Sequence, residues 1–395
     1  MHILILPSWY PKSPADVFGV FFRDQALALS NYGHKVGVIA PEMRSLRNLF
    51  SSELKSNRIH YEFDAGVDTY RRAFFAALPR IPFGNYVLFK CVAKKLLKTY
   101  IDERGKPDII HAHCAIYAGA AAVEIAKDFD IPVVLTEHST GYARGLYARW
   151  QLKMAEKAFK QSRISIAVSP DLGKLLSDLL PSAQNIWKWI PNVVAERFKA
   201  PESFEPELRA IRFVNLALMT EKKGQFDLVK AFKLLVDKDI HAELWLAGDG
   251  PIKEALRREV HDLGIVEKVK FLGLIQPDSV PNLLEQVDVM VVSSHYETFG
   301  VVAAEALMAG LPVIATRCGG PECIISDSDG LLVPVKHPEA LSKAMQNIAL
   351  NLNFYDRKAI ASNAKARFSG AAVAVQLTHE YERIVSETAD QAMPR

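Results

Sequence analysis

Short apolar runs alternate with longer stretches of helical periodicity along the whole chain. In the first half the runs lie at 2–6, 35–40, 108–113, 132–136 and 164–168. They show little polar alternation, which is typical of parallel strands covered on both faces. Helices are predicted between them at 18–32, 86–100, 118–127 and 145–158.

The second half repeats this scheme. Its apolar runs lie at 213–218, 243–247, 270–272, 287–292, 313–315 and 331–333, again separated by helical stretches. Repeated alternation of strand and helix predicts a doubly wound sheet in each half. The segment 195–210 is polar, contains Pro201 and Pro206 and lacks periodicity, so it reads as a linker.

Composition agrees with two soluble α/β domains. The 395 residues are 49% hydrophobic and 24% charged, enough to fill two cores. The net charge of +3 indicates no particular partner, and four scattered cysteines suit a reducing compartment. The N-terminus lacks the pattern of a signal peptide, and no apolar run of about 18 residues predicts a membrane span. We therefore expect a cytoplasmic protein, or one attached peripherally to the inner face of the cytoplasmic membrane.

The most informative stretch is 293–316. A buried strand is followed by a loop with Glu297, and Gly300 then opens a helix that contains Glu305 and stops at Gly310. The first N–H groups of such a helix, from Thr298 onward, form an anion site. Carboxylates accept strong hydrogen bonds from sugar hydroxyls. Taken alone, the stretch also fits an amphipathic helix with two solvated glutamates.

The segment ETFGVVAAEALMAGLPVIA (297–315) resembles the signature of the retaining glycosyltransferases of the GT-B fold, family four, almost position for position. The resemblance implies an α/β protein with two doubly wound Rossmann-like domains facing across a cleft. It assigns Glu297 to the hydroxyls of the donor hexose and Glu305 to the ribose. It assigns the backbone of Thr298, Phe299 and Gly300 to the diphosphate.

Further family patterns follow in the same order. The segment EKKGQFDLVKAF (221–232) is similar to the family's Lys-Gly segment, which places Lys223 on the diphosphate, where an ammonium offsets charge on the leaving group. The family's arginine six residues earlier is Ala217 here, so Lys222, another base or the backbone donors would supply the second charge. LAGDGP (246–251) places Gly248 near the donor, and GGPE (319–322) resembles the family's Gly-Gly loop.

The first half carries candidate acceptor residues. Its opening segment resembles the family's first strand, glycine loop and first helix, with Gly19 allowing close approach of a ligand. It contains no G-x-G-x-x-G fingerprint, which disfavours nicotinamide binding. Candidate acceptor contacts are Trp9, Tyr10, Phe18 and Arg23, with the alternative that half of them serve packing.

Three histidines follow predicted strands. The resemblance places His138 of TEHST beside the reacting sugar, where a neutral imidazole can bond a hydroxyl. His111 and His113 of HAHCA would share one strand face, but spacing supplies no third ligand, so we expect structural histidines. We expect neither a metal nor another cofactor.

One basic and aromatic segment remains. Between residues 70 and 98 we expect a helix that either rests on an anionic membrane or buries one face and solvates the other, the second being favoured. Nucleic acid is disfavoured because the segment matches no recognised reader. Its basic residues are Arg71, Arg72, Arg80, Lys90, Lys94, Lys95 and Lys98.

Together these features predict a retaining, metal-independent transferase. It would move a hexose from a UDP or GDP sugar to a saccharide or polyprenyl-linked acceptor, in envelope polysaccharide or glycolipid synthesis. The predicted domains are 1–198 and 199–370, with a helix at about 371–395 returning to the first. A nucleotide-sugar epimerase on the same scaffold and a non-catalytic partner subunit are the alternatives.

Overall fold

The computed structural model describes residues 1–12, 16, 18–45, 58–76, 83–183, 187–200 and 209–392. The chain forms two compact units. Unit 1 comprises Met1–Val193 and Gly370–Arg395, and unit 2 comprises Val194–Ser369. The first boundary falls a few residues before the predicted position 198. The second falls one residue before the predicted returning helix.

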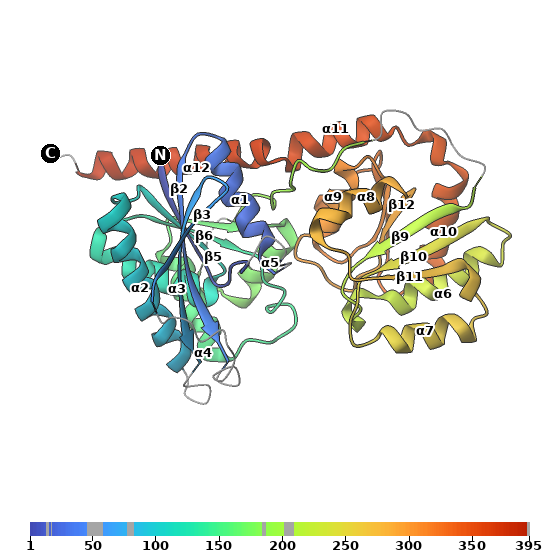
Figure 1. Cartoon of the computed structure of the whole chain (residues 1–395), viewed down its shortest axis with the longest axis horizontal. Helices are drawn as coiled ribbons and strands as arrows, with labels where there is room; N and C mark the ends of the chain where they lie inside the picture. Colours follow the sequence, from blue (N-terminus) through green and yellow to red (C-terminus); the bar gives the residue numbers. More distant parts are fainter. Residues whose placement is uncertain are drawn as a thin grey trace. The chain divides into compact units, whose positions relative to one another are not determined.

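Unit 1 is built on an eight-stranded sheet with the order β3-β4-β2-β1-β5-β6-β7-β8. All neighbouring strands in it are parallel except the β3–β4 hairpin. The strands are β1 (His2–Pro7), β2 (Lys35–Arg44), β3 (His60–Asp64), β4 (Val67–Phe75), β5 (Ile109–His113), β6 (Val133–Glu137), β7 (Ile164–Ala167) and β8 (Lys188–Trp189). Its helices are α1 (Val20–Asn31), α2 (Gly84–Arg104), α3 (Ala120–Ile125), α4 (Arg149–Gln161), α5 (Pro170–Leu179) and α12 (Gly370–Ala392) (Figure 1).

Unit 2 contains a fully parallel six-stranded sheet with the order β11-β10-β9-β12-β13-β14. The strands are β9 (Ile211–Leu216), β10 (Ala242–Ala247), β11 (Val269–Gly273), β12 (Val289–Val292), β13 (Val313–Thr316) and β14 (Gly330–Val333). The helices are α6 (Gln225–Val236), α7 (Lys253–Asp262), α8 (Val280–Glu285), α9 (Val301–Met308), α10 (Pro338–Leu350) and α11 (Arg357–Phe368).

The strand pair β3–β4 is the main departure from the sequence prediction. Residues 70–75 were expected in a helix but lie in β4, which pairs with β2 along its length. A turn at Ala65 and Gly66, both at positive φ, joins β4 to β3. The helical expectation was wrong there because pairing with β2 and burial of Tyr70 override local periodicity.

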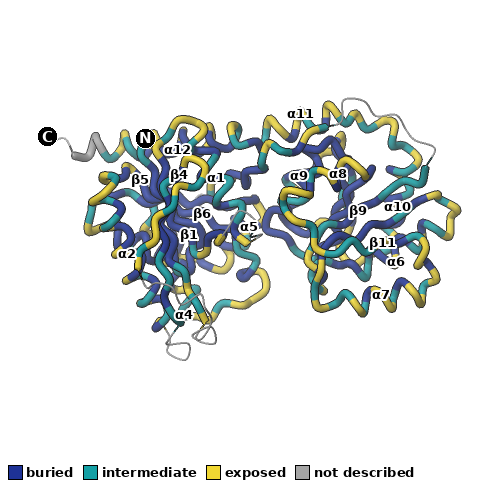
Figure 2. Tube along the Cα trace, viewed as in Figure 1, coloured by how far each residue is buried: buried dark blue, intermediate teal, exposed yellow. Residues whose placement is uncertain are grey.

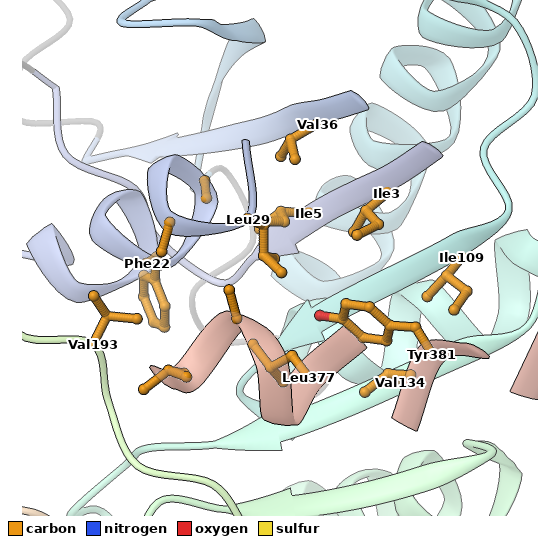
Figure 3. Packing of buried hydrophobic residues seen from close by; sticks show 14 of the residues in the cluster. Ile3, Ile5, Phe22, Leu29, Val36, Ile109, Val134, Val193, Leu377 and Tyr381 are labelled. Carbon is orange, nitrogen blue, oxygen red and sulfur yellow. The ribbon is translucent and has the colours of Figure 1, made fainter. Parts of the chain in front are cut away.

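The core of unit 1 is continuous from α1 to α12. Leu377 and Tyr381 of α12 lie among Ile3, Ile109 and Val134 of three neighbouring strands, as Figure 3 shows. The central strands are buried along most of their length (Figure 2). The last helix is therefore an integral layer of the first unit although it is the last element of the chain.

Among its parallel strands, each sheet reverses the strand order once. The reversal falls between β1 and β5 in unit 1 and between β9 and β12 in unit 2. Loops that leave the carboxyl ends of those strands flank a crevice where doubly wound sheets bind ligands. These two places are therefore the candidate ligand sites of the two units. In the described part of the chain no helix has the length and apolarity that crossing a bilayer requires.

Candidate active site

An ion pair joins the two loops at the reversal point of unit 2. Lys223 follows β9 and Glu297 follows β12, and the lysine Nζ lies 2.5 Å from the glutamate Oε1. The Ser294 hydroxyl donates to the same Oε1 at 2.6 Å. Among the described residues no group donates to the other oxygen, Oε2, which leaves it able to accept a hydrogen bond from a ligand hydroxyl.

The loop that carries Glu297 is fixed on both sides. Its N–H donates to the Cys318 carbonyl at 2.8 Å, and its carbonyl accepts from the Gly320 N–H at 2.8 Å. A Cβ at Gly320 would lie 2.3 Å from the Phe299 carbonyl oxygen, so only glycine permits this approach. The GGPE segment (319–322), which resembles the family's Gly-Gly loop, thus packs directly against the glutamate loop.

The start of α9 presents unused donors beside this pair. Gly300 caps the helix with φ of 91°, in the left-handed region that favours glycine. No described residue accepts a hydrogen bond from the N–H of Thr298, Phe299 or Gly300. These groups and the helix dipole suit an anion, as the sequence predicted.

Three further residues of unit 2 were predicted to contact the donor: Glu305, Lys222 and Gly248. Glu305 lies just over one turn into α9 and is half-buried. The Lys222 carbonyl accepts from the His295 N–H at 2.8 Å, so its backbone belongs to the site loop. Gly248 has φ of 137°, and a Cβ there would meet the Ala217 oxygen at 1.9 Å. The need for glycine at 248 thus follows from backbone packing against the segment that leads to Lys223.

At the reversal point of unit 1, Ser8 ties the end of β1 to the loop after β5. Its hydroxyl donates to the Ile116 carbonyl at 2.7 Å and accepts from the Ala118 N–H at 3.1 Å. Gly19 precedes α1 at φ of 82°, where a Cβ would lie 2.9 Å from the Trp9 ring. Gly19 therefore allows Trp9 to pack over the start of the helix.

The four predicted acceptor contacts divide into two kinds. Trp9 and Phe18 are 41% and 64% exposed, which leaves their rings available to a ligand. Tyr10 is buried beneath the Arg71 guanidinium, so its ring is not available as the platform that the sequence predicted. Arg23 makes a two-pronged ion pair with Asp64 of β3, at 2.6 and 2.7 Å.

His138 is held through both ring nitrogens. Its Nδ1 lies 3.0 Å from the Asn192 Oδ1, and its Nε2 lies 2.9 Å from the His113 Nδ1. With the Asn192 oxygen as acceptor, His138 carries its proton on Nδ1 and accepts from His113, an assignment that follows from the partners. Burial lowers the pKa of His138 to about 3, so the ring is neutral as expected. Neither nitrogen remains for a sugar hydroxyl in this arrangement.

The hydrogen bonds continue from His113 into the core. Gln25 Nε2 lies 3.5 Å from the His113 Nε2 and 3.3 Å from the His111 Nδ1. The Tyr381 hydroxyl of α12 donates to the same His111 nitrogen at 2.6 Å, and the His111 Nε2 donates to Thr136 at 2.7 Å. These proton positions keep all three imidazoles neutral, with the Gln25 amide and the Tyr381 hydroxyl sharing the single lone pair of the His111 Nδ1. We call this the histidine chain.

The loop after β6 is anchored by a buried carboxylate that the sequence analysis did not single out. Glu137 Oε1 accepts from the N–H of His138 and of Ser139, both at 2.8 Å. Its Oε2 accepts from the Ala115 N–H at 2.8 Å and from the Tyr142 hydroxyl at 3.2 Å. Burial raises the pKa of Glu137, an effect that the backbone donors oppose. A polar residue at the end of an apolar strand was the only signal available.

No group of three or more histidine, cysteine, aspartate or glutamate side chains in the described ranges is arranged to hold a metal ion. Three described residues of the basic segment make ion pairs. Arg71 is buried and contacts Glu42 and Glu62, while Lys90 and Lys94 of α2 contact acidic partners at 2.7 and 2.6 Å. Arg80 lies outside the described residues.

Family comparisons assign both halves of the chain. Residues 19–198 match the family described as Glycosyltransferase Family 4, and residues 197–367 match the family described as Glycosyl transferases group 1. Together with the two doubly wound sheets, these matches define the chain as a glycosyltransferase of the GT-B fold. Within that class it belongs to the family-four type.

Similar proteins span almost the whole chain. A Bacillus subtilis glycosyltransferase named for teichuronic acid biosynthesis is 27% identical over 97% of this chain and 99% of its own length. The glycogen synthase of Mycobacterium tuberculosis is 24% identical, over 88% and 86%.

Solved structures share the fold. The sucrose-phosphate synthase of Thermosynechococcus elongatus has a TM-score of 0.76 at 21% identity, covering 98% of this chain and all of that one. The Anabaena protein HepE, in complex with UDP, has a TM-score of 0.70 at 18% identity, covering 97% and 100%.

Proposed function

We propose that this chain is a retaining transferase that moves a hexose from a nucleoside diphosphate sugar to a saccharide or lipid-linked acceptor. The observation that carries the proposal is the arrangement at the reversal point of unit 2. There a lysine, three unused N–H groups and a carboxylate with one unoccupied oxygen converge. An ammonium and a helix start suit a diphosphate, and a carboxylate suits sugar hydroxyls.

The proposed step needs only these groups. The bond between the sugar C1 and the diphosphate oxygen breaks, and the electron pair leaves with the nucleoside diphosphate. Lys223 and the N–H groups of Thr298 to Gly300 stabilise the new charge. The acceptor hydroxyl bonds to C1 on the same face and gives its proton to a phosphate oxygen of the leaving group. Glu297 holds the hexose hydroxyls while this happens.

The relatives support a role in glycan synthesis. One is named for teichuronic acid biosynthesis and another as a glycogen synthase. HepE was solved with UDP and with UDP-glucose. By analogy we propose an envelope polysaccharide or glycolipid as the product and a uridine or guanosine diphosphate sugar as the donor.

Mass spectrometry of donor consumption across a panel of nucleotide sugars tests this proposal. We expect at least one donor to be consumed and to yield a product with retained anomeric configuration by NMR. Glu297→Ala should reduce turnover to background. Glu254→Ala, which removes an exposed carboxylate of α7, should leave it unchanged.

Three results would contradict the proposal. An inverted product would exclude retention. Conversion of the donor to an epimer without acceptor would indicate an epimerase. Absence of turnover with every donor and acceptor mixture would favour a non-catalytic subunit.

A further inference from the structure

A pocket of about 510 Å³ lies between three helices of unit 1. Phe83 and Tyr86 come from the start of α2, and Trp150 comes from the start of α4. We call it the α2–α4 pocket. Its lining residues are Phe83, Tyr86, Ala120, Val123, Glu124, Trp150, Lys153, Met154, Lys157 and Ala158.

The position of the pocket relates it to the ligand edge of the sheet. Helices α2, α3 and α4 follow strands β4, β5 and β6 (Figure 1). Phe83, Tyr86, Ala120 and Trp150 line the pocket from the starts of these helices, while Lys157 and Ala158 line it from further along α4. It therefore lies toward the carboxyl edge of the sheet, where folds of this kind bind ligands.

A ring contact joins the pocket to the loop at the reversal point of unit 1. Tyr117 in that loop is stacked on Tyr86, with ring centroids 6.4 Å apart and planes 9° apart. The loop also contains Cys114 and Tyr117 at positive φ, 68° and 75°, a strained geometry for non-glycine residues. Ser8 holds the same loop through the Ile116 carbonyl. One side of the pocket wall thus continues into the predicted acceptor region.

The wall of the pocket is mainly apolar. The Phe83 and Trp150 rings pack with centroids 4.6 Å apart, and Val123, Met154 and Ala158 complete the surface. Such a lining is suited to a hydrocarbon chain and offers few hydrogen bonds to a sugar.

The charge around the pocket is positive. Lys90 and Lys157 both contact the single carboxylate of Glu124, at 2.7 and 3.0 Å. Lys153 makes no hydrogen bond or ion pair with the described residues and is exposed. Three ammonium groups around the one carboxylate of the lining favour an anionic ligand group.

One polar atom in the wall lacks a partner. The Tyr86 side chain is 6% exposed, and its hydroxyl makes no hydrogen bond with the described residues. Burial chiefly raises the pKa of Tyr86, and the nearby Glu124 carboxylate raises it further. A buried, unpaired hydroxyl costs stability unless a ligand or water satisfies it.

We propose that the α2–α4 pocket binds the hydrocarbon chain of an anionic lipid, with the lysines and the Tyr86 hydroxyl on its phosphate. The occupant is the lipid carrier of the acceptor. This inference rests on the proposed function and deepens it by choosing a lipid-linked acceptor over a free saccharide.

Calorimetry with the full chain tests the pocket directly. The probe is decyl phosphate below its micelle concentration, compared with decanol and with inorganic phosphate. We expect saturable binding of decyl phosphate, binding of decanol at least tenfold weaker, and no measurable binding of phosphate alone.

Variants assign the binding to the pocket. Lys153→Glu should weaken decyl phosphate roughly threefold to tenfold, because it reverses an exposed charge. Lys160→Glu, the same change on α4 outside the pocket lining, should have no effect. Ala120→Phe should block the binding of both decyl phosphate and decanol, because the new ring would fill the space lined by Ala120. Tyr86→Phe should weaken decyl phosphate roughly twofold to tenfold while raising the Tm of the free protein, since the unpaired hydroxyl is gone.

The pocket and the proposed function can fail separately. If decyl phosphate does not bind saturably, or if Lys153→Glu and Lys160→Glu act alike, the pocket proposal is overturned while donor turnover still decides the function. If the variants alter binding only to phosphatidylglycerol vesicles and not to the soluble probe, the surface contacts a membrane and the pocket proposal is wrong. If decyl phosphate binds as expected but no donor is consumed, the proposed transferase function is wrong and the proposed lipid site is still supported.

Discussion

The Lys223 ammonium contacts the Glu297 carboxylate although 74 positions separate the two residues in the chain. The contact exists because their loops leave adjacent strands, β9 and β12, on either side of the point where the strand order reverses. It brings together the group proposed for the diphosphate and the group proposed for the sugar.

Replacing Lys223 should therefore lower the catalytic rate more than it lowers the stability of the fold. We expect Lys223→Ala to lower kcat about 10²–10³-fold, the usual cost of removing one stabilising group from a developing anion. Lys230→Ala removes an exposed ammonium from α6 and should leave kcat unchanged. Steady-state kinetics with the best donor measure both. Equal effects of the two substitutions would remove Lys223 from the mechanism.

Gly320 should be needed for the position of Glu297. In Gly320→Ala the new methyl group would overlap the Phe299 carbonyl, so we expect a loss of roughly 1–3 kcal/mol and at least a tenfold fall in kcat/KM. Gly264→Ala has open space around the new methyl and should cost stability through its positive φ without changing kcat/KM. Denaturant unfolding and kinetics distinguish these results. An active, stable Gly320→Ala variant would show that the loop relaxes freely.

The histidine chain predicts that unit 1 loses stability in mild acid. Burial lowers the pKa of His111 and His138 to about 3, below the unfolded value of 6.5. The unfolded state therefore binds more protons below pH 6.5, and each histidine removes up to about 1.4 kcal/mol per pH unit as the pH falls toward 3.

Hydrogen exchange of β5 and β6 between pH 7.5 and 5 measures this loss. Tyr381→Phe removes a donor to His111 and should lower stability by about 1 kcal/mol at pH 7.5. His261→Ala removes an exposed imidazole of α7 and should change neither the stability nor its pH slope. If exchange in β5 and β6 is independent of pH after correction for intrinsic rates, the histidines are not neutral in the fold.

Glu137→Gln should loosen the loop that carries His138. All four contacts of the carboxylate are donors, and an amide would turn one acceptor oxygen into another donor facing two of them. We expect a loss of roughly 2–6 kcal/mol, since two buried donors lose their acceptor. Glu382→Gln on the exposed side of α12 is the matched control. A wild-type Tm for Glu137→Gln would mean that the loop needs no anion.

Metal removal should not affect turnover. The proposed step assigns the leaving-group charge to Lys223 and the α9 N–H groups, so the rate in excess EDTA should equal the rate in buffer. Titration of Mg²⁺ and Mn²⁺ into chelated enzyme provides the measurement. A rate that depends strictly on either ion would overturn the metal-independent step.

Much of the fold follows from local pattern. Apolar runs without polar alternation locate strands such as β1, β5 and β12 to within a residue or two, because strands covered on both faces have few polar positions. β4 escaped detection because charged residues interrupt its apolar pattern, including the buried Arg71, and because its pairing with β2 is a long-range contact. The sequence also showed no sign of the roles of Ser8, Gln25 and Tyr381. Such residues are common, and their hydrogen bonds depend on neighbours that are distant in the chain.

The sequence by itself determined the two α/β halves, the family type and the glutamate-bearing stretch at 297–305, because these depend on periodicity and short spacing. The tertiary structure decided which groups meet: Lys223 with Glu297, His138 with His113 and Asn192, and Tyr10 with a buried neighbour instead of open space. Those contacts depend on strand order and on the packing of α12 against the first sheet. No local pattern of residues encodes the distances between segments so far apart in the chain.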